Sequence, residues 1–241
     1  MGNPARIALV GAAMALLALS TAGCTPAAKG TNPGGRAAAS PSQVAPAPAG
    51  SAGAVAIPVG AGPKAAYLAQ AQPAPGSCHY RYTADKQPLP DTACTPGATS
   101  PAVTQANIND TICKPGGYTS AIRPPSNITG KEKADNAKSY GYSGPAGDAE
   151  YDHLISLQLG GDPNDPRNLW VEPPSPDHLA GKGPNNPKDS VETHLHTAIC
   201  KGQTTLAAAQ QAIATDWTTA EAKLGIKPAG TATPDASTDG D

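Results

Sequence analysis

The stretch from residue 25 to residue 76 constrains the fold most, because it contains almost nothing that could form a core. Its residues are nearly all Ala, Pro, Gly, Ser, Thr, Gln and Val, with a single tyrosine. Such a segment cannot bury enough apolar area to offset the entropy lost on ordering. We therefore expect a disordered tether over 24–76 and a similar tail over 228–241. A loop-rich lead-in at 77–102 and one folded domain at 103–227 remain.

The first 23 residues have the pattern of a signal peptide. Arg6 precedes an apolar run from Ile7 to Leu19, which is too short to span a bilayer permanently. Small residues then lead to Cys24, as in a bacterial lipobox, although Thr21 stands where such boxes prefer Leu. We expect export, followed either by a lipid anchor at Cys24 or by ordinary cleavage that releases the protein. No later stretch is apolar enough to span a membrane.

The remaining cysteines agree with export. They are four in number, Cys78, Cys94, Cys113 and Cys200, and disulfides persist outside the cytosol. Four cysteines allow three pairings, among which the sequence does not choose. We prefer Cys78–Cys94 with Cys113–Cys200. A zinc site is disfavoured, because the chain has no Cys-x-x-Cys or Cys-x-x-His pair.

The hydrophobic pattern predicts an α+β domain, in which helices pack around a two-stranded hairpin. The two strands are expected at 151–159 and 168–171, on either side of a Gly/Asp/Pro/Asn turn cluster. Shorter β-type runs are expected within 102–125. Helices are expected at 127–140, with Thr129 as a capping residue, at 188–200, and from 204 or 205 to 224.

The residues suited to catalysis gather at this hairpin. Asp152 and His153 lie on the first strand, and Asn168 begins the second. Phosphodiester hydrolysis needs a base for water, which a neutral imidazole supplies, and a cation, for which a carboxylate is a suitable ligand. Adjacent strand residues point to opposite faces. Asp152 and His153 can therefore serve one site only if the strand ends or bends there.

The sequence DHLI, followed by GG and then NLW, resembles the HNH (ββα-metal) endonuclease family. The wider resemblance, to an exported bacterial branch carrying this domain, covers roughly residues 100–225. It includes the stretches TICKPGGYTSAIRPP, YDHLISLQLGGDPNDPRNLWVEP, KDSVETHLHTAIC and LAAAQQAIATDW. The resemblance implies a disulfide-stapled ββα-metal core with additional helices.

The resemblance also implies a role for each matching residue. His153 would be the general base, Asp152 a metal ligand, and Asn168 the residue that orients His153. The third ligand would be His178, ten residues after Asn168, or Asn186, just before the following helix. The implied cofactor is Mg²⁺ or Mn²⁺ rather than Zn²⁺, and the implied partner is nucleic acid, DNA before RNA.

Charge argues for a local rather than a global nucleic-acid surface. The chain carries a net charge of −2, whereas non-specific DNA binders usually present a basic surface. The stretch 113–140, which includes Arg123, is locally basic and is a candidate phosphate track. No protein partner can be inferred from the sequence.

Two alternatives stay open. One is a non-catalytic, disulfide-stapled binding lipoprotein on the same scaffold. The other is a zinc hydrolase of the cell wall, against which the chain has no His-Glu-x-x-His pattern.

Overall fold

The computed structural model describes residues 56–184 and 186–227. The predicted signal peptide at 1–23, most of the tether, the tail at 228–241 and the candidate lipid site Cys24 lie outside the described residues. No helix within the described part has the length and apolarity needed to cross a bilayer.

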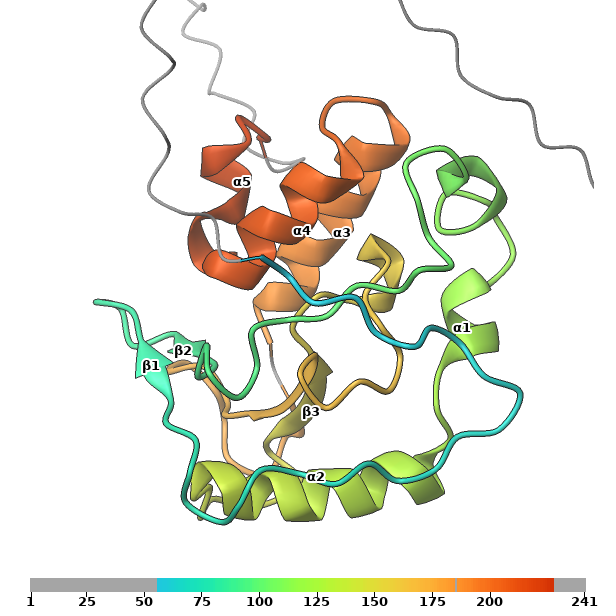
Figure 1. Ribbon diagram of the computed structural model, residues 1–241. Helices are drawn as coiled ribbons and strands as arrows, with labels where there is room; N and C mark the ends of the chain where they lie inside the picture. The colour runs from blue at the N-terminus through green and yellow to red at the C-terminus, as the bar shows by residue number, and fades with distance from the viewer. Residues whose placement is uncertain (1–55, 185, 228–241) are drawn as a thin grey trace, which may run out of the picture. The chain divides into compact units, whose positions relative to one another are not determined.

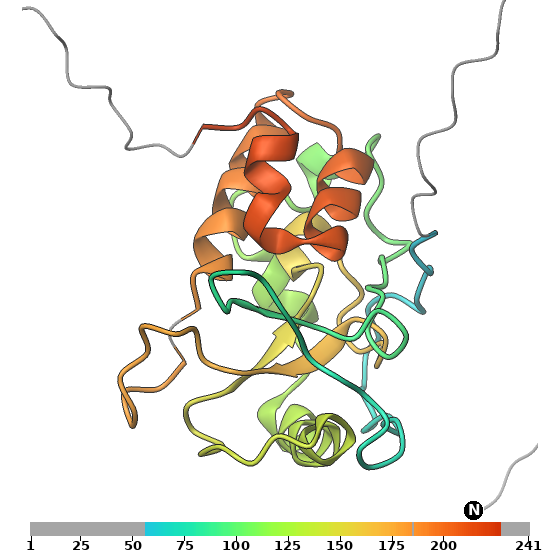
Figure 2. The same cartoon turned by 90° about the vertical axis from the view of Figure 1, so that its left-hand side faces the viewer.

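The described residues form the expected α+β arrangement. A small hairpin lies between α2 on one side and a group of three helices, α3, α4 and α5, on the other (Figures 1 and 2). The hairpin strands are β3 (Glu150–His153) and β4 (Leu169–Glu172), which pair antiparallel. A second, two-residue ladder pairs β1 (Arg81–Tyr82) with β2 (Pro88–Leu89).

The helices are, in chain order, α1 (Tyr118–Ile122), α2 (Ser126–Tyr140), α3 (Lys188–Cys200), α4 (Leu206–Thr215) and α5 (Ala220–Lys223), with 3-10 turns at Ile108–Asp110, Leu157–Leu159 and Trp217–Thr219. The prediction for α3 is confirmed, including its bounds. Its apolar residues recur at four-residue spacing, and two of them, Leu195 and Ile199, are fully buried in the core between the hairpin and α4.

Three predictions for the helical parts of the chain were wrong in part. The run 118–123 is helical rather than β, and it ends before Pro124, which disfavours helical geometry in the preceding residue. The predicted cap Thr129 lies inside α2, which starts at Ser126. The expected long helix over 205–224 breaks at Asp216, whose extended backbone and side chain begin a new turn by accepting the Thr218 amide at 3.0 Å.

The predicted first strand is also shorter than expected. β3 stops at His153 instead of running to Leu159, and the chain then turns into a 3-10 segment. The cause is Asn168, whose side chain takes up both backbone groups of Ile155, at 3.0 Å each. A strand whose backbone groups are bound by a side chain cannot extend its ladder.

The end of the predicted tether is ordered, which corrects its boundary. Residues 56–76, here called the strap, run past the loop that joins β3 to β4 and then follow α2 (Figure 1). Gly62 donates its amide to Asp162 at 2.6 Å, and the Tyr67 hydroxyl donates to the carbonyl of Ile122 at 2.6 Å. The strap is bound mainly through hydrogen bonds. Because it contains few apolar residues, its hydrophobic pattern gave no sign that it is ordered. The lead-in at 77–102 is likewise part of the domain.

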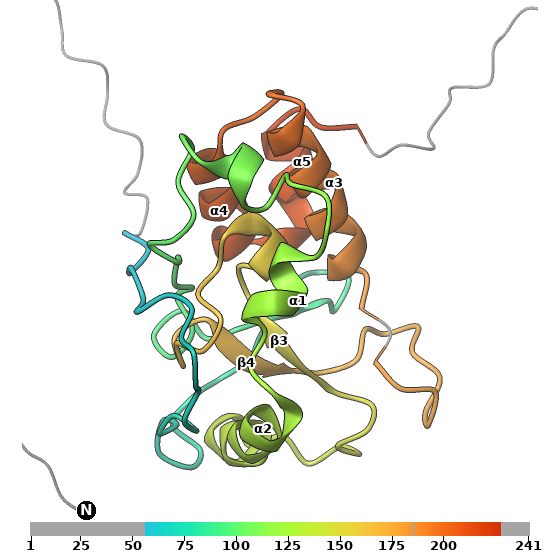
Figure 3. The ribbon, with the colours of Figure 1, turned by 90° about the vertical axis from the view of Figure 1, so that its right-hand side faces the viewer.

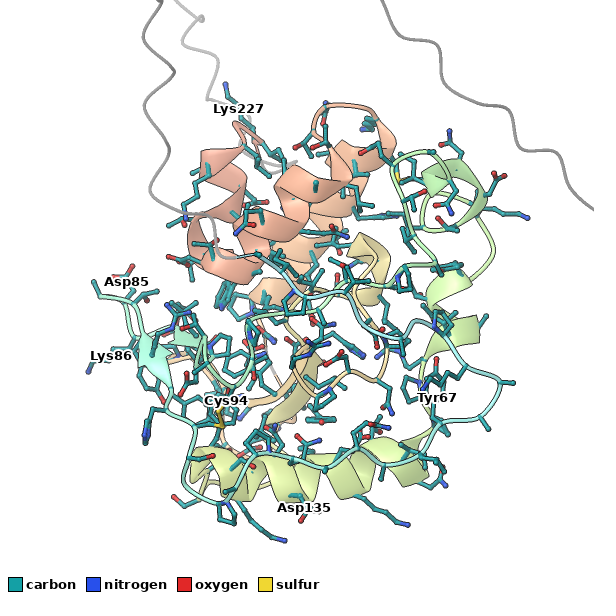
Figure 4. The ribbon with its side chains drawn as sticks, in the orientation of Figure 1. Tyr67, Asp85, Lys86, Cys94, Asp135 and Lys227 are labelled. Atoms are coloured by element: carbon teal, nitrogen blue, oxygen red, sulfur yellow. A yellow bond between two sulfur atoms is a disulfide. The ribbon has the colours of Figure 1, made fainter. Side chains whose placement is uncertain are left out.

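Two disulfides, Cys78–Cys94 and Cys113–Cys200, are present, which confirms the preferred pairing. The first lies near the start of the β1–β2 region, where Figure 4 labels Cys94, and the second ties the loop before α1 to the end of α3. Such bonds form and persist in an oxidising compartment.

Candidate functional site

The β3–β4 register divides the hairpin into two faces with different chemistry. Glu150 pairs with Glu172, and Asp152 pairs with Trp170, so these four side chains share one face. We call it the acidic face. Tyr151 and His153, with their partners Val171 and Leu169, share the other, which we call the histidine face. Figure 3 shows the hairpin between α2 and the α3–α5 group. Asp152 and His153 thus lie on opposite faces, at the point where β3 ends.

His153 is bound to the protein through one ring nitrogen. Its Nε2 lies 3.0 Å from the carbonyl oxygen of Pro163. A carbonyl only accepts, so Nε2 carries the proton. Nδ1 has no hydrogen-bond partner among the described residues, yet it is not one of their fully sealed polar atoms. Burial lowers the pKa of His153 to about 4, although the Pro163 carbonyl opposes this shift. His153 is therefore neutral, with an open lone pair on Nδ1.

Asn168 closes the loop between the two strands. Its Oδ1 accepts from the amides of Ile155 and Ala98, and its Nδ2 donates to the carbonyls of Ile155 and Asp162, all within 3.0 to 3.2 Å. The side chain is completely buried. It forms no hydrogen bond with His153. Instead, it holds the loop residue next to Pro163, and the Pro163 carbonyl orients the imidazole ring.

Gly161 permits this closure. A Cβ at this position would lie 1.7 Å from the carbonyl oxygen of Ile155 and 2.9 Å from Nδ2 of Asn168. Any larger residue would therefore displace the loop that carries the histidine's partner. Its neighbour Gly160 has a φ of 71°, which L-residues rarely adopt.

Asp152 is paired with a buried lysine that the sequence analysis did not identify. Nζ of Lys188, at the first residue of α3, donates to Oδ2 of Asp152 at 2.7 Å and to the carbonyl of His153 at 2.9 Å. It also contacts Glu192 one turn later. Burial disfavours the charge on Lys188, but Asp152 and Glu192 outweigh burial and raise its pKa. Trp170 Nε1 donates to the same Asp152 oxygen at 3.2 Å.

Carboxylates outnumber Lys188 at the acidic face. Besides Asp152 and Glu192, the face carries Glu172, which is 2% exposed, and the half-buried Glu150. Burial, reinforced by the charge of Asp152, raises the pKa of Glu172 well above its usual range and raises that of Glu150. Burial also raises the pKa of Glu192 to about 7, against the attraction of Lys188. One lysine cannot balance four ionised carboxylates, and the raised pKa values show that burial keeps part of the cluster protonated.

Of the two candidates for a third metal ligand, only Asn186 reaches the acidic face. Its amide lies close enough to Glu150 and Glu172 to lower the pKa of each, although it forms no well-oriented hydrogen bond with either. His178 lies instead beside Asp148, with 3.4 Å between Nε2 and Oδ1. The structure therefore brings Asp152 and Asn186 to one region and leaves His178 at its edge.

Residues that the sequence reasoning missed are Glu172, Lys188 and Glu192. Glu172 could have been found from the register, because a hairpin that pairs Asp152 with Trp170 puts residue 172 on the same face. No signal in the sequence identifies Lys188 as buried, since lysine is almost never fully buried.

A separate cluster joins Cys113, His196 and Cys200, whose donor atoms lie within 4.8 Å of one another. The two sulfurs are bonded to each other, and Nε2 of His196 lies 2.8 Å from the carbonyl of Ile112. A disulfide has no thiolate to offer a metal, so the oxidised protein cannot use this cluster as a cation site.

Comparisons with protein-family models, with curated proteins and with solved structures found no match for this chain.

Proposed function

We propose that this protein is an exported, metal-dependent phosphodiesterase that cuts nucleic acid, DNA before RNA, on an HNH-type ββα core. The observation that carries the proposal is His153. Its ring is fixed through Nε2 at the end of a short hairpin, and its second nitrogen is left without a partner among the described residues. An imidazole arranged in this way is prepared to accept a proton from water.

His153 acts as the general base. Nδ1 takes the proton from the attacking water, and the carbonyl of Pro163 keeps the ring in the tautomer that makes this possible. Asn168 contributes indirectly, as a positioning residue, because it holds the loop that carries Pro163. The exposed Arg123 lies near enough for its charge to be felt at His153, and it can attract a phosphate.

The residues present fit a hard cation. Trp170 and Lys188 both donate to Oδ2 of Asp152, which leaves Oδ1 to contact an ion. Asn186 lies in the same region. Carboxylate and amide oxygens are the donors that Mg²⁺ and Mn²⁺ prefer. Asp152 and Asn186 would hold the ion, which supplies charge neutralisation at the scissile phosphate when bound. His178, beside Asp148, is not needed for this set.

One observation favours a second candidate function, a non-catalytic binding lipoprotein on the same scaffold. Lys188 already supplies a cation to Asp152, and its Nζ is bonded on all sides by protein oxygens. In a protein that only binds its target, such a lysine would serve as a permanent structural replacement for a metal.

A plasmid-nicking assay separates these functions. The protein, with both disulfides intact, is incubated with supercoiled DNA in Mg²⁺, Mn²⁺, Zn²⁺ or EDTA. We expect cleavage in Mg²⁺ or Mn²⁺, and His153→Ala should reduce the rate at least about 100-fold, since a general base contributes that much. Zn²⁺ dependence would favour the cell-wall hydrolase of the sequence analysis.

The matched control is His79→Ala, which removes an exposed histidine in the β1–β2 region. This variant should cleave like the unmodified protein. Absence of DNA and RNA cleavage by the folded protein would overturn the nuclease proposal and leave the binding lipoprotein.

A further inference from the structure

Glu172 is a buried carboxylate that the protein leaves unpartnered. It is the last residue of β4 and is 2% exposed. Both of its side-chain oxygens are sealed from solvent, and neither accepts a hydrogen bond from the described residues. Buried polar groups are normally paired, and a buried carboxyl without a partner avoids the cost of its charge by holding a proton, which agrees with the raised pKa of Glu172. Such a group in a folded protein requires an explanation, and a missing ligand is one.

The surroundings of Glu172 supply more negative charge rather than a partner. Glu150 lies directly opposite it on β3, and Asp152 lies two residues further along the same face. The buried cation Lys188 forms hydrogen bonds with Asp152, Glu192 and the carbonyl of His153, and among the described residues it forms none with Glu172 or Glu150. The lysine therefore binds directly at one end of the acidic face, whereas at the other end it acts on Glu172 and Glu150 only through its charge.

The Glu150–Glu172 end of the acidic face borders a small pocket. Its lining includes Asp148, Glu150, Glu172 and Asn186, and its wall is formed by prolines of the loop before α3. Nδ2 of Asn186 is sealed and unpartnered among the described residues, like the oxygens of Glu172. The Asn186 amide lies close enough to lower the pKa of Glu172, but its N–H is a donor and cannot bind a cation. The acceptors that a cation could use in this pocket are the carboxyl oxygens of Glu172 and Glu150.

We propose that Glu172 and Glu150, with the free oxygen of Asp152, bind a divalent cation of the Mg²⁺ or Mn²⁺ type. This inference builds on the proposed function and moves the centre of its cation site from Asp152 to the Glu150–Glu172 pair. The three carboxylates come from one face of one rigid hairpin, and Lys188 fixes Asp152 by its other oxygen. An all-oxygen donor set selects hard cations over zinc.

The test measures cation binding in the absence of nucleic acid. The disulfide-intact protein is titrated with Mn²⁺, and binding is followed by calorimetry and by the loss of the free-ion signal in electron paramagnetic resonance. We expect one site per chain, with competition by Mg²⁺. Glu172→Gln, which keeps the shape of the side chain, should weaken Mn²⁺ binding at least about tenfold, as expected when a charged ligand is lost.

Asp85→Asn is the matched control, because Asp85 is an exposed acid in the β1–β2 turn, far from the hairpin (Figure 4). It should bind Mn²⁺ like the unmodified protein. A purely structural role for Glu172 predicts that Glu172→Gln unfolds at a lower temperature without metal, whereas a cation ligand predicts an unchanged or higher midpoint. Unaltered Mn²⁺ affinity in Glu172→Gln, or no binding by the unmodified protein, overturns the inference.

The outcomes separate this inference from the nuclease proposal. His153→Ala should leave Mn²⁺ affinity unchanged, because His153 lies on the other face. Mn²⁺ binding at Glu172 without any cleavage would keep the cation site and remove the nuclease. Cleavage with unaltered Mn²⁺ affinity in Glu172→Gln would keep the nuclease and remove the site proposed here.

Discussion

The two faces of the β3–β4 hairpin differ in the kind of group that they leave without a hydrogen-bond partner among the described residues, a neutral hydroxyl (Tyr151) on the histidine face and a carboxyl (Glu172) on the acidic face. On the histidine face, Nε2 of His153 is bonded to a carbonyl, and the surrounding loop is closed by four hydrogen bonds of Asn168. On the acidic face, Lys188 neutralises part of a carboxylate cluster, and Glu172 has no partner among the described residues. Successive side chains of a strand point to opposite faces, so residues that are neighbours in the sequence lie in these two different environments.

This difference shows how one small hairpin can carry a neutral base on one face and a group of carboxyls on the other. The histidine face fixes an uncharged base without needing a ligand. The acidic face accumulates charge that only a cation or protons can balance. β3 ends at His153, which meets the condition that the sequence argument set for a shared site.

The largest expected effect comes from removing the one buried cation of the acidic face. Lys188→Met preserves much of the side-chain volume but leaves Asp152 and Glu192 unpaired. We expect a loss of about 3–5 kcal/mol in the free energy of unfolding, because breaking one partner of a buried ion pair leaves an uncompensated charge. Urea unfolding, followed by circular dichroism, measures this loss.

The control is Lys138→Met, which breaks the exposed Lys138–Asp135 pair on α2. Surface pairs contribute little, so the change should stay below about 1 kcal/mol. If both variants lost the same amount, Lys188 would not be the cation on which the acidic face depends, and the contrast between the faces would fail.

The next effect concerns the histidine face. Asn168→Ala removes the side chain that binds both backbone groups of Ile155 and the carbonyl of Asp162. We expect a loss of about 2–4 kcal/mol, since several buried groups lose their partners at about 1–3 kcal/mol each and some recover them by relaxation. The same urea titration measures it.

Asn127→Ala, at an exposed position on α2, is its control and should change the stability by less than about 0.5 kcal/mol. A second readout tests the positioning role. The ring protons of His153, observed by NMR, should shift in Asn168→Ala, because the loop that carries Pro163 loosens. An unchanged His153 signal in a destabilised variant would show that Asn168 supports the fold without orienting the base.

The sequence predicted those parts of the molecule that local rules determine. The four-residue spacing of apolar side chains in α3 and the turn cluster between the strands follow from residues near one another. The two disulfides match the pairing that was preferred among three, although the sequence did not choose among them. The hairpin placed Asp152 and His153 on opposite faces, as alternation requires.

The rest depended on tertiary contacts that no local pattern contains. α2 buries Glu132, Asn136 and Ser139 rather than an apolar stripe, so its burial could not be recognised from periodicity. The strap docks through hydrogen bonds from a low-complexity segment. Lys188 is buried because the start of α3 meets the hairpin, and a lysine at a helix start usually faces solvent.

The smallest effect tests whether the histidine face also depends on a buried charge, since Glu132 lies near enough for its charge to act on Tyr151. Glu132 of α2 is 1% exposed; its Oε1 accepts the amide of Gln70 at 2.7 Å, and its Oε2 is sealed without a partner among the described residues. Burial raises the pKa of Glu132, although the Gln70 amide opposes this. The folded state therefore holds a proton on Glu132 more tightly than the unfolded state does, and stability is lost as the pH rises from the unfolded pKa through the folded one.

Glu132→Gln removes this charge and keeps an acceptor for Gln70. We expect the variant to match the unmodified protein near pH 4 and to exceed its stability by about 1 kcal/mol near pH 8, where the unmodified carboxylate is ionised and only half paired. Urea unfolding at the two pH values measures the difference, with Asp135→Asn on the exposed side of α2 as the control. A Glu132→Gln variant that is less stable at both pH values would mean that the ionised carboxylate anchors the strap. The histidine face would then depend on a buried charge, and the contrast between the two faces would be one of degree.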